Sequence, residues 1–145
     1  MEKSKKVRIK SVKECIEDYS KYKKDDYLTK LIISLKLNEI YIAISTEVEN
    51  VVSEDDANAK IKNNYSIFPA IVASEGNKFW FSCFSDVEEI PESFKENHAI
   101  VPVMFKDLVE ECLKHRDIEG ISINHKSNAR ASFPKWVLRA IKHHL

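Results

Sequence analysis

The chain reads SIFPAIVASEGNKFWFSCF over residues 66–84, which is the pattern of two strands joined by a turn. Residues 66–73 are rich in apolar side chains, and Pro69 favours a position at a sheet edge or a bulge. Gly76 supplies the positive φ that the turn needs. Both alternating faces of 78–84 carry aromatic side chains, so we expect both faces to be covered. The stretch therefore predicts a β-hairpin in a sheet with helices against it.

Helix and strand patterns alternate on both sides of this hairpin. Apolar residues at three- and four-residue steps indicate helices, and short runs rich in β-branched side chains indicate strands. We therefore predict a single α/β or α+β domain, with a mixed central sheet of about five strands and helices packed on it. The expected helices cover residues 11–22, 26–38, 106–115 and 134–144, with a shorter one inside 86–94. The expected further strands cover 40–44, 99–105 and 118–124.

Single residues at helix ends carry further predictions. Ser85, with Glu88 three residues later, is expected to cap the short helix, which Pro91 limits to one or two turns. Asn38 is expected to end the second helix as a residue that tolerates the left-handed conformation, and Pro134 suits the first turn of the last helix. The helix expected at 106–115 has a predicted buried stripe of Leu108, Val109, Cys112 and Leu113, with Glu110 and Glu111 facing outward. The helix expected at 134–144 has a predicted apolar face of Trp136, Val137, Ala140 and Ile141.

The composition excludes several classes of protein. A chain of 145 residues has the size of one domain, and 43% hydrophobic residues are too many for a disordered chain. Equal numbers of basic and acidic residues leave no overall charge that would attract nucleic acid or an anionic membrane. No apolar run approaches the roughly 20 residues that span a bilayer. Since the chain holds only 2 Gly, a glycine-rich phosphate-binding loop is also excluded.

Charge is nevertheless uneven along the chain. Residues 1–13 hold six Lys or Arg against one Glu and lack the apolar stretch of a secretory signal, so we expect a cytoplasmic protein. We interpret residues 1–26 as a basic, partly helical extension and 27–145 as the domain proper. A basic arm could also contact an acidic partner, but nucleic acid is disfavoured because no aromatic residue lies within the charged block. Residues 46–64 are acidic and are expected to form a long surface connection.

Four stretches, spread over most of the chain, occur in an order that resembles a known family. They are LTKLIISLKLNEIYIAI (28–44), FWFSCFS (79–85), FKDL (105–108) and GISINH (120–125). In this order and spacing, residues 27–145 resemble the amino-terminal domain of the bacterial SseB family. The resemblance implies the fold and permits a chaperone-like, immunity-type or secretion-associated role, but the family has no agreed biochemical activity.

The chain departs from this family at two places. In one, Cys83-Phe84-Ser85-Asp86 replaces the usual threonine-serine pair, although Ser85 can still cap a helix. In the other, His125 stands where the family usually has proline, which puts any role of a rigid turn there in doubt.

Cysteine and histidine give no pattern typical of a catalytic or metal centre. Cys15, Cys83 and Cys112 are far apart and form no CxxC pair, so we expect buried free thiols in a reducing compartment. Cys83 precedes an expected helix start, which could activate a nucleophile, but its alternation with aromatics favours a core thiol. The five histidines lack the spacing of zinc ligands, and we expect them to be exposed. The sequence therefore predicts no catalytic residue, metal or cofactor.

The polar residues after the last expected strand form a candidate ligand site. The carboxyl ends of strands in α/β sheets are common binding positions, and these side chains suit a phosphate or carboxylate. The alternative is that Asn124 and Asn128 only shape a turn. The candidate ligand-binding residues are Asn124, His125, Lys126, Ser127, Asn128 and Arg130.

Aromatic residues suggest a different kind of site. Trp80, Phe84 and Trp136 are candidates for binding a partner, because aromatic side chains often anchor interfaces, although most of them lie in cores. The leading hypothesis is a non-catalytic protein–protein interaction module with a protein partner, and association with a second copy of the chain is left open. The alternative is a small-ligand-binding or enzymatic protein that uses the 124–130 loop.

Overall fold

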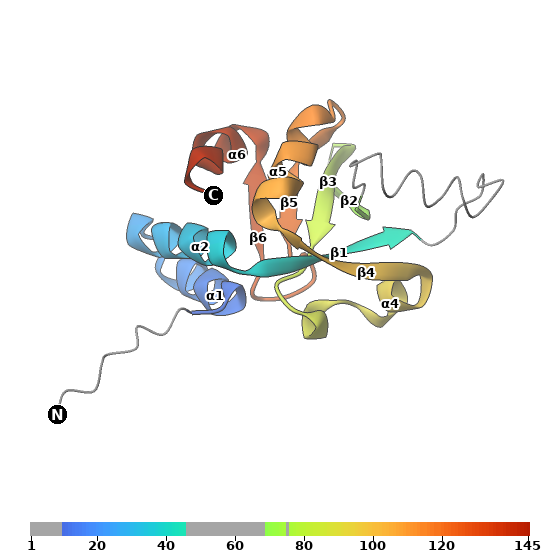
Figure 1. The fold of residues 1–145 in the computed structure, drawn as a ribbon, viewed down its shortest axis with the longest axis horizontal. Coiled ribbons are helices and arrows are strands. Elements are labelled where there is room, and N and C mark those ends of the chain that lie inside the picture. Colours follow the sequence, from blue (N-terminus) through green and yellow to red (C-terminus); the bar gives the residue numbers. More distant parts are fainter. Residues whose placement is uncertain (1–9, 46–68, 75) are drawn as a thin grey trace.

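The computed structural model describes residues 10–45, 69–74 and 76–145 (Figure 1). The acidic connection expected at 46–64, most of the basic block and the start of the expected strand 66–73 lie outside the described residues. Among those described, no helix combines the length and the apolar character that a membrane crossing requires.

The first two helices form a pair that lies side by side (Figure 1). α1 (Val12–Tyr22) begins at Ser11, which caps it together with Glu14, and ends at Lys23, where the backbone turns left-handed with φ 50°. α2 (Asp25–Leu37) then runs back along α1. Although α1 lies in the expected extension, it contributes Cys15 and Ile16 to the same core as the rest of the chain.

The strands divide between two sheets, and the expected mixed α+β fold is confirmed. The larger sheet has the order β2-β3-β5-β6, with β2 (Ile71–Ser74), β3 (Lys78–Cys83), β5 (Ile118–Ile123) and β6 (Ala131–Pro134). β3 and β5 are parallel, while the other neighbours are antiparallel. The second sheet pairs β1 (Glu39–Ser45) with β4 (His98–Met104) and crosses the first steeply (Figure 1). Tyr41 and Phe84 join the two by a pair of backbone hydrogen bonds of 2.8 Å.

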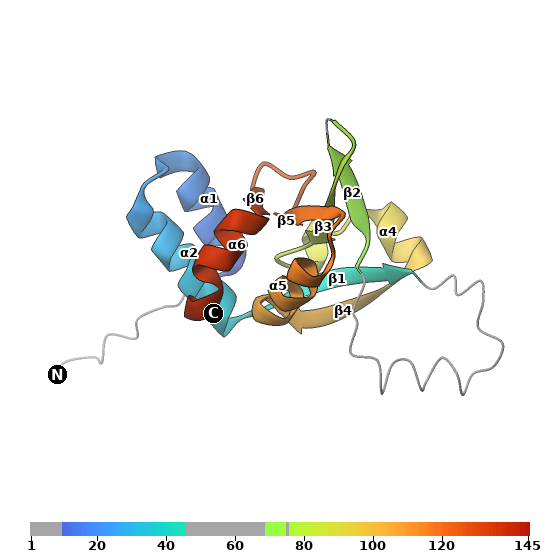
Figure 2. The same cartoon turned by 90° about the horizontal axis from the view of Figure 1, so that it is seen from above.

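One face of the larger sheet builds the core. The register places Phe81 opposite Ile121 and Cys83 opposite Ile123, so all four side chains share a face, and all are buried. α5 (Phe105–Lys114) and α6 (Lys135–Ile141) pack together against this sheet, followed by a short 3₁₀ turn, η2 (Lys142–His144). Figure 2 shows the α1–α2 pair beyond α6 at one end of the molecule and the β2–β3 hairpin projecting away from it.

The prediction of one short helix inside 86–94 is wrong in the capping residue and in the length, because a 3₁₀ turn and a separate helix occupy this region. Asp86, rather than Ser85, caps a 3₁₀ turn, η1 (Val87–Glu89), because its Oδ1 accepts a hydrogen bond from the Glu89 N–H at 3.1 Å. Pro91 then precedes α4 (Glu92–Asn97) as its N-cap, since a residue without an N–H suits a helix start. Ser85 instead donates a hydrogen bond to the Asp86 carboxylate at 3.1 Å.

Two other helix ends differ from the prediction in detail: α2 does end at Asn38, but this residue is not left-handed, and α6 begins just after Pro134. Asn38 is extended (φ −123°) and closes α2 through its side chain, whose Nδ2 donates to the Ser34 carbonyl at 2.9 Å. Pro134 lies at the end of β6 and is the N-cap of α6 rather than part of its first turn. Strand β6 itself was not expected, because four residues carry too short an alternation to stand out.

Two predicted helix faces need correction as well. Glu111 is only 4% exposed rather than facing outward. Its carboxylate lies 3.7 Å from His115 Nε2 and 3.6 Å from Lys114 Nζ, and these contacts offset part of the cost of burying the charge. In α6, Leu138 and Ile141 face the core, while Trp136 and Ala140 are exposed.

Candidate functional site

The carboxyl ends of parallel strands β3 and β5 meet at Asn124, as expected for the candidate loop. Asn124 is 1% exposed and has a positive φ of 54°. Its Oδ1 accepts from the Ser85 N–H at 2.9 Å, and its Nδ2 donates to Ser85 Oγ at 2.8 Å and to the Ala129 carbonyl at 3.0 Å. Both hydrogens of the Asn124 amide therefore bond within the protein, and the side chain links the loop after β3, at Ser85, to the loop after β5, at Ala129.

Ser127 and Asn128 continue this turn. Ser127 donates its N–H to the Asn124 carbonyl at 2.8 Å, and its Oγ accepts from the Ala129 N–H at 3.0 Å. Both residues line a polar cleft of about 500 Å³ against α1, beside the ion pair between Lys13 and Glu89 at 2.7 Å. Ser127 is thus a turn-building residue as well as part of a surface cleft.

His125 points elsewhere, into a cluster of aromatic rings. Its ring centroid lies 5.9 Å from Phe84 and 6.0 Å from Phe94, and Phe94 also contacts His98 at 5.1 Å. His125 Nδ1 lies 3.3 Å from Ser82 Oγ, a pair that no sequence pattern indicated. The two residues are 43 positions apart, and only the parallel pairing of β3 with β5 brings them together.

A serine beside a histidine is the arrangement of an activated nucleophile, but burial argues against that chemistry here. Ser82 has no exposed surface, so no substrate reaches its hydroxyl in this conformation. The half-buried ring of His125 instead gives the buried Ser82 hydroxyl a hydrogen-bond partner.

The surroundings of His125 predict a pH dependence of stability. Burial, assisted by the charge of Lys126, lowers the pKa of His125 below its ordinary value of 6.5. The unfolded chain therefore binds this proton more readily, and the stability contributed by neutral His125 is present above pH 6.5 and lost as the pH falls toward the lower folded pKa.

Urea unfolding from about pH 7.5 to about pH 5.5 tests this expectation. In His125→Phe, which keeps a ring against Phe84 and Phe94, we expect a smaller loss of unfolding free energy on acidification than in the unsubstituted protein. Equal acid losses in both proteins would contradict the expectation, because every other titrating group is shared.

The structure confirms the expectation that the cysteines are buried free thiols. All three thiols are free and buried. Burial raises the pKa of Cys112 to about 11 and that of Cys83 further, so neither supplies a thiolate near neutral pH. The histidine prediction is correct only for His143 and His144, since His98, His115 and His125 are half-buried. No three His, Cys, Asp or Glu side chains converge as metal ligands within the part of the chain that the structure describes.

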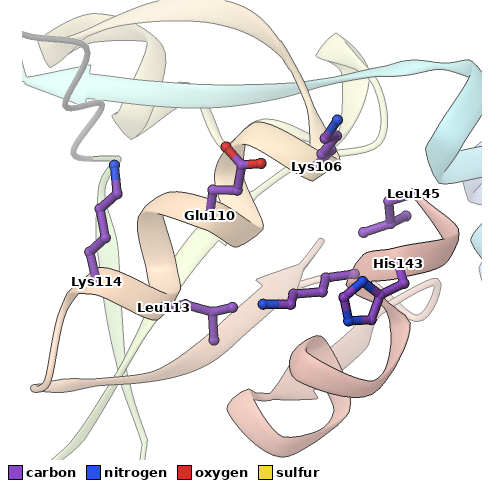
Figure 3. A pocket seen from close by; sticks show the side chains of 7 residues that line it. Lys106, Glu110, Leu113, Lys114, His143 and Leu145 are labelled. Carbon is purple, nitrogen blue, oxygen red and sulfur yellow. The ribbon is translucent and has the colours of Figure 1, made fainter.

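A hollow of about 560 Å³ lies between α5 and the last residues of the chain (Figure 3). On α5, Glu110 lies one turn from Lys106, and the charge of Lys114 is already close to the Glu111 carboxylate. Leu113 and His143 lie on opposite sides of the hollow (Figure 3). All of its charged residues are exposed, so they can bind water and need no ligand.

A groove of about 770 Å³ separates the α1–α2 pair from β6 and α6, and we call it the β6 groove. Trp136 stands at this groove with 72% of its surface exposed. The groove brings together Asn128 and Arg130 from the candidate ligand site and Trp136 from the candidate partner site. Its lining residues are Tyr19, Ser20, Lys23, Leu28, Asn128, Arg130, Ala131, Ser132, Phe133, Trp136, Val137, Ala140 and Ile141.

The groove lining is apolar with two positive charges. Only Lys23 and Arg130 are charged among the lining residues, and none of these is an Asp or Glu. Neither cation forms an ion pair within residues 10–45, 69–74 and 76–145. The other four candidate loop residues do not line the groove: Asn124 is buried, His125 contacts the aromatic cluster, Lys126 is exposed and Ser127 lines the cleft against α1.

The remaining two partner candidates lie away from this groove. Phe84 is 1% exposed and packs against Phe94 at 5.9 Å, so it presents no surface to a partner. Trp80 is half-buried across the sheet from Gly120, and its Nε1 donates to Ser74 Oγ at 2.9 Å.

Comparisons of the chain with models of known protein families, with curated proteins and with solved structures found no match. The resemblance to the SseB amino-terminal domain therefore stays a prediction from the residues quoted above.

Proposed function

We propose that this protein is a non-catalytic protein–protein interaction module that binds a segment of another protein in the β6 groove. The observation that supports it is Trp136, which is 72% exposed beside an apolar groove. Tryptophan is the residue type most enriched at the energetic centres of interfaces, where a neighbouring pocket receives the partner.

The charge of the groove supports a partner of defined chemistry. Lys23 and Arg130 border the apolar lining, which contains no acidic residue, so a segment with apolar and acidic side chains complements it. The candidate catalytic groups support the non-catalytic part of the proposal, because Cys83 and Ser82 are both fully buried. The side chains of the 124–130 loop lie in different surroundings, which disfavours a single small-ligand site there.

Site-specific photocrosslinking tests the proposal in the cell. A photoreactive amino acid at the exposed, groove-lining position of Ala140 keeps Trp136 intact. We expect an adduct with another protein, and we expect Trp136→Ala to reduce its yield by about tenfold, the cost of losing a central aromatic anchor.

The same reagent at Leu37 is a matched control, since Leu37 is exposed and apolar on α2 but does not line the groove. The proposal is wrong if positions 140 and 37 give the same adducts. It is also wrong if the adduct at 140 contains only a second copy of this chain, or if Trp136→Ala leaves the yield unchanged.

A further inference from the structure

The β6 groove adjoins the edge of the larger sheet. β6 is the last strand in the order β2-β3-β5-β6 and pairs only with β5 among the described strands. An edge strand carries N–H and C=O groups on its outer side that no sheet neighbour satisfies, and an added strand can bond to them.

The lining shows that the groove faces the edge of β6 rather than one face of the sheet. Successive side chains of a strand point to opposite faces, so a pocket on one face contacts every second residue. Three successive residues, Ala131, Ser132 and Phe133, all line the groove. A bound segment therefore meets the backbone edge of β6.

The length of β6 limits the segment that pairs with it. Four residues span about 13 Å, and Pro134 has no N–H to donate. Backbone pairing is thus confined to residues 131–133, and the bound segment needs about four residues in extended conformation.

Side chains around this edge define the chemistry of the segment. Arg130 directly precedes β6, and its guanidinium can hold a carboxylate through two parallel hydrogen bonds. On the other side of the groove, Lys23 ends α1 and adds a second positive charge. Trp136 and Val137 offer apolar surface to a side chain next to the carboxylate.

We infer that the partner segment binds by adding a strand to the outer edge of β6, with an Asp or Glu directed at Arg130 and an apolar side chain against Trp136. This inference rests on the proposed function and names its mode of binding and the chemistry of the partner. It predicts that recognition depends on the peptide backbone as well as on the side chains.

A random heptapeptide library displayed on phage and selected on the full chain supplies the probe. We expect the selected peptides to be enriched in Asp or Glu next to β-branched or aromatic residues. A selected peptide is then synthesised with a fluorescent label, and its affinity is measured by anisotropy. N-methylation of backbone amides is expected to weaken binding about tenfold at alternate positions and to have little effect at the positions between them, because only every second amide of a strand faces its neighbour.

Charge reversal tests the acidic contact. Arg130→Glu is expected to weaken a Glu-containing peptide about tenfold and to improve the same peptide with Lys in place of that Glu. Arg139→Glu is the matched control, because Arg139 is exposed on α6 but does not line the groove.

The outcomes separate this inference from the proposed function. Peptides that need Trp136 but tolerate every N-methylation overturn strand addition and leave the interaction module standing. The same holds if no peptide is selected while position 140 still crosslinks to a partner protein. Peptides that bind equally well to Trp136→Ala, together with no Trp136-dependent crosslink, overturn both. Equal effects of Arg130→Glu and Arg139→Glu overturn the acidic contact.

Discussion

Replacing Gly120 with alanine is expected to destabilise the fold by about 3 kcal/mol, the upper range for overpacking a core. A Cβ at this position would lie 2.8 Å from Pro134 Cα and 2.8 Å from Cζ3 of Trp80, and it would meet the Phe133 carbonyl oxygen even more closely. Gly120 pairs with Trp80 of β3 on one side and with Pro134 of β6 on the other, so an added Cβ cannot move away from one strand without approaching the other. Two of the three obstacles are backbone atoms of β6, which side-chain rotation cannot move.

Urea unfolding measures this effect, and the chain offers a matched control. Gly76→Ala adds the same methyl group where no atom lies within 4 Å, although the φ of +76° disfavours any side chain. Its cost is therefore about 1 kcal/mol. Removing the Trp80 ring from the Gly120→Ala protein should restore little, since the contacts with β6 remain. Equal stabilities of the two alanine variants would contradict the close approach of β5 and β6.

Replacing Asn124 with alanine is expected to cost about 2–4 kcal/mol. The substitution removes three side-chain hydrogen bonds and leaves the Ser85 N–H and the Ala129 carbonyl without these partners. It also places alanine at φ 54°, a conformation that asparagine tolerates better. Because Asn124 links the loops after β3 and β5, its loss weakens the turn that leads into β6.

Two further variants separate the causes. Asn124→Gly removes the hydrogen bonds but accepts the positive φ, so it should be about 1 kcal/mol more stable than Asn124→Ala. Asn124→Asp can still accept from the Ser85 N–H but cannot donate to the Ala129 carbonyl, so it should not recover the stability of asparagine. Denaturation midpoints give the order. If Asn124→Ala unfolds within about 0.5 kcal/mol of the unsubstituted protein, these bonds do not stabilise the fold.

The candidate site shows how far sequence reasoning reached. The sequence indicated Arg130, Asn128 and Trp136 as functional candidates, and the β6 groove contains all three. It assigned them to two separate sites, because a loop residue and a residue of the next helix share no local pattern. The other side of the groove comes from Tyr19 in α1 and from Lys23 just after it, more than a hundred positions earlier in the chain. No periodicity within a short window can indicate such a contact.

The short helix α6 illustrates a second limit. Its apolar residues Trp136, Val137, Leu138, Ala140 and Ile141 surround most of a seven-residue helix. A hydrophobic stripe predicts the buried face only when the opposite face is polar. In α6 apolar residues lie on several faces, so the sequence pattern fits more than one choice of buried face. The contact with the sheet buried Leu138 and left Trp136 exposed, and this choice created the candidate anchor.

The amino-acid order by itself determined the helices α1, α2 and α5, the β2–β3 hairpin, the buried thiols and the mixed α+β class, because these depend on periodicity, turn chemistry and local apolarity. Tertiary structure alone decided the division into two sheets, the contact of Ser82 with His125, the edge position of β6 among the described strands and the groove beside it. The physical reason is that strand pairing and helix docking are settled by long-range burial of apolar surface, which many local sequence patterns satisfy equally well.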